Sequence, residues 1–287
     1  MRLIAYEKNG QAALGARIND ELVELASGDD TLPASLEQIL ALGAAGSEAV
    51  ARAIVAAKSR ISLQGLKYLP PVLNPGKSIC VGLNYVDHVA ESPYKDLPKY
   101  PVLFSRWRSS YVAHGDVLMR PHVSFEFDYE GEVVAVIGKS GRYITKERAL
   151  EHVAGYSLFN DGSIRDFQFK STQWMMGKNF DATGSFGPEF VSADEIPSGA
   201  VGLQLQTRLN GQTVQNANTR DMIFDIATLV SICSVAVELR PGDIIISGTP
   251  AGVGFGRKPP LFMKAGDVCE VEVEGLGVLR NSVRDET

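Results

Sequence analysis

The sequence is poor in cysteine, with only three cysteines among 287 residues. Cys80, Cys233 and Cys269 are odd in number, lie far apart and have apolar neighbours. This pattern argues against a disulfide framework and a thiolate metal site, and it is typical of reduced thiols in a protein core. We therefore expect a cytoplasmic location.

The sequence also lacks long apolar runs and blocks of basic residues. No apolar run approaches the roughly 20 residues that a membrane-spanning helix needs. Residues 1–6 lead directly into a strand-like pattern, without the apolar core of a signal peptide. The net charge is −6 and no cluster of lysine and arginine creates a positive surface. The sequence thus predicts neither a membrane partner nor a nucleic-acid partner.

The composition that remains is that of a globular protein, with 45% hydrophobic and 22% charged residues. Residues 1–70 predict a small N-terminal α+β domain, in which short strands joined by Asn-Gly and Asn-Asp turns precede two helices. Its predicted strands cover residues 3–6, 13–18 and 22–25, and its predicted helices cover residues 35–42 and 47–58.

Residues 71–287 form the second predicted domain, which is rich in strand patterns and has two predicted helices, at 146–152 and 223–237. Because the strands do not alternate regularly with helices, the pattern argues against a doubly wound sheet. The predicted fold class is α+β and mainly β, a mixed β-sandwich or roll with the small N-terminal module attached. Strands are expected at 78–81, 102–104, 132–137, 155–159, 189–191, 203–209, 244–247 and 268–273.

The most informative motif is Asp-Tyr-Glu-Gly-Glu at residues 128–132, which precedes the apolar run 133–137. Side chains alternate between the two faces of a strand, so Glu130 and Glu132 project from the same side. Two buried carboxylates side by side repel each other and require a shared proton or a cation. The pair therefore predicts half of an oxygen-ligand site for a hard divalent metal.

Two other segments hold candidate acid–base residues. His88 and Glu91 are three residues apart, so one helical turn would place the carboxylate beside the imidazole, as in a general base with its orienting partner. A surface ion pair has the same spacing. Asp161 ends a predicted strand within an Asn-Asp-Gly run and could supply a third carboxylate, although such a run also forms a simple turn.

A lysine and a glycine-rich loop complete the candidate site. Lys178 stands among bulky apolar residues, where it could pair with the carboxylates or stabilise an oxyanion. It could equally extend its ammonium group to the solvent. The loop at 247–254 follows an apolar strand and exposes backbone N–H groups that can hold an anion. Because it lacks the lysine of a phosphate-binding loop, a carboxylate is the expected ligand.

In this order the motifs resemble those of the fumarylacetoacetate hydrolase family, over roughly residues 75–285. The resemblance implies a mixed β-sandwich roll like the C-terminal domain of that family, a homodimeric state and a bound Mg²⁺ or Mn²⁺. It further implies that Glu130, Glu132 and Asp161 are the metal ligands and that Lys178 is the active-site lysine beside the metal.

The same resemblance assigns residues to the substrate. His88 and Glu91 match the His–Glu pair of the acylpyruvate-hydrolysing members, and the motif pattern is closest to these and to the oxaloacetate decarboxylase-like members. Thr249, in the Gly-Thr-Pro loop, would bind the substrate carboxylate. Apart from the resemblance, Gln168 lies near the lysine in the sequence and could bind the substrate by stabilising an oxyanion.

The chain departs from the family pattern at two places. Many members have Lys-Pro where this chain has the segment 105–110. Arg106 in that segment could add recognition of an anionic substrate, or it could belong to a surface turn. Gly162 replaces the apolar residue that is common after the third carboxylate.

These residues suggest hydrolysis of a C–C bond in a 2,4-dioxo acid of the acylpyruvate or fumarylpyruvate type. The carboxylate and 2-oxo group of the substrate would chelate the metal, and His88 would take a proton from the water that attacks the 4-carbonyl. Lys178 or Gln168 would stabilise the oxyanion. Cleavage of the C3–C4 bond would then leave a metal-bound pyruvate enolate.

Other reactions use the same ligands, and the sequence leaves them open. An oxaloacetate-type decarboxylase and a 2-oxo-diene-acid isomerase both pass through the same enolate. Lesser alternatives are a sugar-acid lactonase or dehydratase and a non-catalytic metal-binding protein. Because all-oxygen sites accept both Mg²⁺ and Mn²⁺, the sequence does not choose between them.

Overall fold

The computed structural model describes residues 1–92 and 96–287. Within these residues the larger sheet has the order β4-β3-β2-β1-β13-β11-β10-β16-β5-β6, and β7 pairs with β13. The strands of this sheet are β1 (Arg2–Lys8), β2 (Gln11–Ile18), β3 (Glu21–Glu24), β4 (Arg60–Ser62), β5 (Ser78–Gly82), β6 (Val102–Ser105), β7 (Tyr111–Ala113), β10 (Gly131–Ile137), β11 (Val153–Asn160), β13 (Gly184–Ser192) and β16 (Ile244–Ile246).

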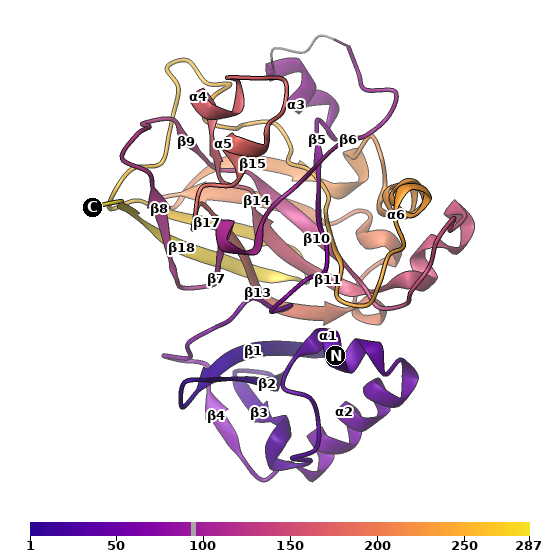
Figure 1. Cartoon of the computed structure of the whole chain (residues 1–287). Helices are drawn as coiled ribbons and strands as arrows, with labels where there is room; N and C mark the ends of the chain where they lie inside the picture. The colour runs from indigo at the N-terminus through magenta and orange to yellow at the C-terminus, as the bar shows by residue number, and fades with distance from the viewer. Residues whose placement is uncertain (93–95) are drawn as a thin grey trace.

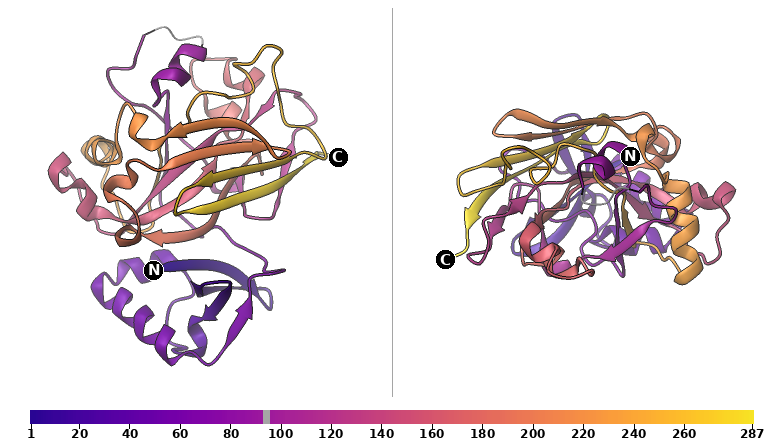
Figure 2. Two further views of the ribbon diagram at one scale, coloured as in Figure 1. Left: turned by 180° about the vertical axis from the view of Figure 1, so that it is seen from behind. Right: turned by 90° about the horizontal axis from the view of Figure 1, so that it is seen from above.

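A second, five-stranded sheet has the order β15-β14-β17-β18-β8 and lies over the first, as the rear view in Figure 2 shows with its orange and yellow strands. Two further short strands pair with each other as a separate two-stranded sheet. The strands of the second sheet are β8 (Val117–Arg120), β14 (Gln204–Leu209), β15 (Gln212–Asn218), β17 (Val268–Val273) and β18 (Gly277–Asp285), and the short pair is β9 (Phe127–Asp128) and β12 (Ser163–Ile164). The predicted mainly β, mixed sandwich is confirmed.

Helices are few and short in the described residues. The α-helices are α1 (Leu36–Ala41), α2 (Ala44–Ala56), α3 (Val86–Glu91), α4 (Arg165–Gln168), α5 (Met175–Lys178) and α6 (Ile226–Ala236). The 3₁₀ turns are η1 (Leu25–Ser27), η2 (Arg108–Ser110), η3 (Lys146–His152), η4 (Ala193–Glu195), η5 (Ser198–Ala200) and η6 (Thr219–Asp221).

Three of the predicted helices differ from the structure in type or extent. The helix predicted at 47–58 is α2, which begins at Ala44 and ends at Ala56. The segment predicted as a helix at 146–152 is the 3₁₀ turn η3, which ends where β11 begins. The helix predicted from residue 223 begins three residues later, because the side chain of Asp225 accepts the backbone N–H of Thr228 and caps α6 there.

The central strand β10 is buried on both faces, and this decides where its polar residues point. Val133, Ala135 and Ile137 pack into one core with residues of the second sheet and of α6. Val134 and Val136 pack into another core with β1, β2, β16 and the N-terminal helices. Side chains alternate along the strand, so the residues just before Val133 also divide between these two faces.

The N-terminal segment extends the larger sheet. Strand β1 pairs with β13 through Arg2↔Val191 and Leu3↔Phe190, while α1 and α2 cover its own strands. In Figure 1 this indigo part lies at one end of the molecule, and α3, α4 and α5 lie at the opposite end. The domain boundary at residues 70 and 71 stays a prediction.

Glu24 is the buried polar centre of that N-terminal part. Its carboxylate accepts the hydroxyl of Tyr6 at 2.8 Å, pairs with Lys8 at 2.7 Å and also accepts the hydroxyl of Ser59. Burial alone would raise the pKa of Glu24, but these hydrogen bonds outweigh it and lower the pKa to about 2.

Nowhere in the described chain is a helix long and apolar enough to cross a membrane.

Candidate active site

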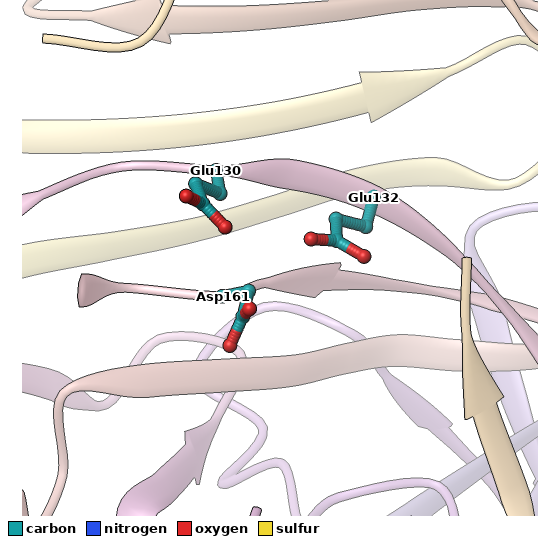
Figure 3. Close-up of side chains that lie close together, drawn as sticks. All are labelled: Glu130, Glu132 and Asp161. Carbon is teal, nitrogen blue, oxygen red and sulfur yellow. The ribbon is translucent and has the colours of Figure 1, made fainter. Parts of the chain in front are cut away.

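Two adjacent strands bring the three predicted metal ligands together. Glu130 directly precedes β10 and Glu132 is its second residue, so both carboxylates hang from the same side of the strand in Figure 3. Asp161 directly follows β11, and its backbone N–H donates to the carbonyl oxygen of Glu130 at 2.8 Å. One carboxylate oxygen from each residue lies within 4.8 Å of the other two. The structure thus gathers the predicted triad into one cluster.

The three carboxylates are buried, and their charges are balanced unequally. Lys178 Nζ lies 2.6 Å from Glu130 Oε2 and 2.6 Å from Asp161 Oδ2. Burial opposes ionisation of Glu130, but Lys178 and Arg165 hold its pKa below the ordinary value. Glu132 accepts one backbone N–H but forms no ion pair within the described residues. Burial and the charges of Asp161 and Glu130 raise the pKa of Glu132 well above its ordinary value.

If all four carboxylates are ionised, the buried charges around the triad leave one negative charge uncompensated. Four carboxylates face three cationic side chains in this centre, which gives a formal charge of −1. These side chains are Asp128, Glu130, Glu132, Asp161, Arg106, Arg165 and Lys178. A divalent cation held by oxygen donors would supply the partner that Glu132 lacks and would make the centre positive. The donor set therefore fits Mg²⁺ or Mn²⁺, and the resulting charge suits a carboxylate substrate.

Helix α3 carries the candidate base. His88 Nδ1 lies 2.9 Å from Glu91 Oε1, as the spacing of one helical turn predicts. His88 and Glu91 line the same pocket as Glu130, Glu132 and Lys178. Because the carboxylate holds the proton on Nδ1, Nε2 is the nitrogen that can exchange a proton in the pocket.

The glycine-rich loop at 247–254, together with the next residue Phe255, donates most of its backbone N–H groups to carboxylates of the protein itself. In sequence order, Gly248 donates to Glu132, Gly252 and Val253 donate to Glu91, and Gly254 and Phe255 donate to Asp128. The loop is an anion-binding element, as predicted from its glycines, but the anions that it holds here are side chains. It therefore ties a candidate metal ligand and the His–Glu pair to one segment.

Two predicted substrate-binding residues, Thr249 and Gln168, line the pocket. Thr249 Oγ1 donates to the carbonyl oxygen of Gly131 at 3.1 Å and accepts from Gln215 Nε2 at 2.8 Å. Its hydroxyl proton is therefore in use, and no acceptor for its backbone N–H lies among the described residues. Gln168 Oε1 accepts from Arg165 Nη1 at 2.8 Å, which leaves its amide NH₂ as the group that can donate to a ligand.

Comparisons with known proteins place this arrangement in a family. The model of the fumarylacetoacetate (FAA) hydrolase C-terminal family matches residues 77–284. The chain belongs to the fumarylacetoacetate hydrolase family. Relatives named oxaloacetate tautomerase, mitochondrial, are 38% identical in Xenopus laevis, over 99% of this chain and 90% of the relative, and 40% identical in Homo sapiens (FAHD2A), over 91% and 83%. The solved structure of a fumarylacetoacetate hydrolase from Exiguobacterium antarcticum is 35% identical, with a TM-score of 0.86 over 100% of both chains.

In this member of the fumarylacetoacetate hydrolase family, Arg106 pairs with Asp161, one of the candidate metal ligands, and has no donor left for a substrate. Its side chain is fully buried, and Nη1 lies 2.6 Å from Asp161 Oδ1. The other N–H groups donate to Ser110, Gly162 and Thr183. The prediction that Arg106 binds substrate is wrong, because protein acceptors use every one of its donors.

The second departure from the family pattern, at Gly162, has a steric explanation. A Cβ atom at this position would lie 1.9 Å from the carbonyl oxygen of Thr183. The backbone that follows Asp161 therefore has no room for the apolar residue that is common there in the fumarylacetoacetate hydrolase family.

Asp128 and Arg165 belong to the site although no role was predicted for them. Arg165 Nε donates to Asp128 Oδ2 at 2.8 Å, and Nη2 lies 2.7 Å from Glu130 Oε1 without good hydrogen-bond alignment. The alternation of residues 128, 130 and 132 was a usable signal, because it predicts that all three acidic side chains share a face. The local sequence around Arg165 contains no comparable signal.

Proposed function

We propose that this chain is a divalent-metal-dependent tautomerase of oxaloacetate-type 2-oxo dicarboxylic acids, which interconverts their enol and keto forms. The observation that carries the proposal is that the His88–Glu91 pair lines the same pocket as Glu130 and Glu132, two members of the three-carboxylate centre. The relatives named oxaloacetate tautomerase, which match along nearly the whole chain, favour this reaction over the C–C hydrolysis expected from the sequence.

The reaction needs proton transfers and no cleavage between heavy atoms. In ketonisation the hydroxyl on C2 loses a proton, C3 gains a proton, and the C2–C3 double bond becomes a C2–O double bond. A divalent cation held by Glu130, Glu132 and Asp161 would, when bound, withdraw charge from the 2-oxygen of the substrate. His88, oriented by Glu91, would carry the proton at C3.

Other residues of the pocket would orient the substrate and keep water out. The backbone N–H of Thr249 and the amide of Gln168 are donors for a carboxylate or carbonyl oxygen. The remaining wall is largely apolar, which limits the access of water. Its apolar residues include Val81, Leu83, Phe104, Phe169, Trp174, Val253 and Phe255. A proton-transfer reaction requires no water molecule beside the substrate carbon, so this wall favours tautomerisation over hydrolysis.

A second candidate is the metal-dependent hydrolase of 2,4-dioxo acids. The His88–Glu91 pair also has the geometry to take a proton from water, and the structural relative from Exiguobacterium antarcticum is titled a hydrolase. Decarboxylation of an oxaloacetate-type acid would use the same carboxylate centre.

Product analysis separates these reactions. The Mn²⁺-loaded and EDTA-treated proteins are mixed with enol-oxaloacetate, and loss of enol absorbance is followed together with pyruvate formation. We expect metal-dependent ketonisation without pyruvate, and a loss of about 10²–10⁴-fold in His88→Asn, the usual contribution of general acid–base catalysis. His122→Asn is the matched control, because His122 is an exposed histidine paired with Glu286.

Each contrary result has a definite meaning. Release of pyruvate and CO₂ from oxaloacetate would show that the activity is decarboxylation and not tautomerisation. Cleavage of acylpyruvates without enhanced ketonisation would establish the hydrolase. Equal rates for the wild type and His88→Asn would remove His88 from the proposed mechanism.

The cytoplasmic location and the homodimeric state expected from the sequence also belong to this proposal. The relatives in Xenopus laevis and Homo sapiens are named mitochondrial, so cell fractionation is needed to test the location. Sedimentation equilibrium would test for twice the chain mass of 31.0 kDa.

A further inference from the structure

The residue between the two glutamates has an unusual set of partners. Glu130 and Glu132 face the pocket, so Gly131 faces the second sheet, and an added Cβ there would lie 2.2 Å from Thr207 Oγ1. The backbone N–H of Gly131 donates to Gln215 Oε1 at 2.9 Å. Its carbonyl oxygen accepts from Thr249 Oγ1 at 3.1 Å. Side chains from outside β10 therefore form hydrogen bonds with both the N–H and the carbonyl oxygen of Gly131.

These two bonds are parts of a closed ring. Gln215 Nε2 donates to Thr249 Oγ1 at 2.8 Å, which connects the two partners of Gly131. The same amide nitrogen donates to the carbonyl oxygen of Pro250 at 2.8 Å. Gln215 is only 2% exposed and lies on β15, in the sheet opposite the metal centre. One amide thus connects the second sheet, the glycine-rich loop and the backbone between the two glutamates.

We propose that Gln215 is a positioning residue for the metal centre, acting through Gly131 and Thr249. The proposal rests on metal binding by Glu130 and Glu132, as part of the proposed function. The two peptide units of Gly131 carry these glutamates, so rotation of either unit changes the spacing of their oxygens. Metal sites require ligand distances within about 0.2 Å of their preferred values, so small rotations are costly. Loss of the amide would also leave the buried N–H of Gly131 without an acceptor.

The ring also gives the Thr249 hydroxyl a direction. A hydroxyl has one proton, and the amide of Gln215 already donates to this oxygen. The proton of Thr249 must therefore point to the carbonyl oxygen of Gly131. As a result, Thr249 can donate to a ligand in the pocket through its backbone N–H but not through its hydroxyl.

Thr207 provides a matched control at the same place. It is the cross-strand partner of Gln215 and is fully buried beside Gly131. Its hydroxyl has no hydrogen-bond partner among residues 1–92 and 96–287, so it takes no part in the ring. Thr207→Val replaces the buried hydroxyl by a methyl group, so the side chain keeps its shape and every hydrogen bond of the ring is kept.

The test is the Mn²⁺ affinity of the full, metal-free chain, measured by electron paramagnetic resonance of free Mn²⁺ without substrate. We expect Gln215→Met to weaken binding by about 10–100-fold, the usual effect of losing a group that orients a metal ligand. Thr249→Val breaks the ring at another bond and should weaken binding similarly, whereas Thr249→Ser and Thr207→Val should bind like the wild type. The double variant of Gln215→Met and Thr249→Val should bind no more weakly than either single variant, because both break one ring.

The outcomes separate the two levels of the proposal. A wild type that binds no Mn²⁺ overturns the metal centre and, with it, the role of Gln215. A wild type that binds Mn²⁺ beside a folded Gln215→Met of equal affinity overturns the role of Gln215 alone. If Gln215→Met does not fold, Thr249→Val decides the question, and unchanged Mn²⁺ affinity in that variant rejects the ring. An equal loss in Thr207→Val also rejects it, because general damage to the core would then explain the effect.

Discussion

Replacing Glu132 by glutamine should stabilise the metal-free protein while removing its response to metal. Glu132 is 1% exposed and forms no ion pair in the described part of the chain, and its ligand oxygen lies within 4.8 Å of those of Glu130 and Asp161. At an effective dielectric constant of about 20, two unit charges at this distance repel each other by roughly 3.5 kcal/mol. Folding without metal must therefore either bear this repulsion or protonate Glu132, whose pKa is raised well above its ordinary value by burial and by the neighbouring carboxylates. Lys178 attracts Glu132 and offsets part of this cost. Glu132→Gln keeps the size of the side chain and an acceptor for the backbone N–H of Gly248, so the net gain in unfolding free energy should be about 1–3 kcal/mol.

The order of stability should reverse when metal is added. The wild type gains about 4.1 kcal/mol at a Mn²⁺ concentration one thousand times its dissociation constant, because the ion binds only the folded state. Glu132→Gln lacks one of the three charged ligands and should gain little. Urea unfolding of both proteins, with EDTA and with excess MnCl₂, measures all four free energies.

One result would refute this reasoning directly. If Glu132→Gln is less stable than the wild type in EDTA, the protein stabilises the charged form of Glu132 without a metal, and the count of buried charges is wrong. Glu48→Gln serves as the control, since Glu48 is an exposed partner of Arg52 on α2 and should change stability by no more than about 0.5 kcal/mol.

Three other substitutions test separate parts of the structure. Gly162→Ala places a Cβ atom 1.9 Å from the carbonyl oxygen of Thr183, so thermal unfolding should show a loss of more than about 2 kcal/mol. Arg106→Met leaves Asp161 without its buried arginine and should cost about 3–5 kcal/mol in urea unfolding with EDTA; a cost near zero would mean that Arg106 does not stabilise that carboxylate. The folded-state pKa of Glu24, about 2, lies below its ordinary 4.5, so its stabilisation is complete above pH 4.5 and is lost as the pH falls toward 2. The wild type should lose roughly 2–3 kcal/mol across that window, and Glu24→Gln should lack this part of the acid dependence.

The Glu130–Glu132 pair could be predicted from the sequence because its geometry is local, whereas Asp161 was assigned as the third ligand by the resemblance to the family. Alternation along one strand places Glu130 and Glu132 together, and a carboxylate at the end of another strand was a reasonable third ligand. The His88–Glu91 contact could likewise be predicted, because a spacing of three residues on a helix places the two side chains beside each other.

The errors and omissions concern contacts between distant segments. Whether Arg106 faces solvent, substrate or a carboxylate depends on where Asp161 lies, 55 residues further along the chain. Gln215 carries no local sign of its position, because only the packing of the second sheet brings its amide to Gly131. The hydroxyl of Thr249 lies in the predicted loop, yet its orientation follows from that same amide.

Glu130 and Glu132 lie at the start of β10, which pairs with β11 on one side and with β16 on the other, so the carboxylates and most of the pocket wall come from different elements. All seven residues of β10 are buried, so a substitution at any of these positions disturbs the packing on one of its two faces. The pocket wall comes in large part from α3, α4, α5 and the loops around them, at the end of the molecule away from the N-terminal part. Substitutions in these short segments at positions other than His88, Glu91, Arg165 and Lys178 can therefore reshape the pocket without touching the carboxylates on the strands.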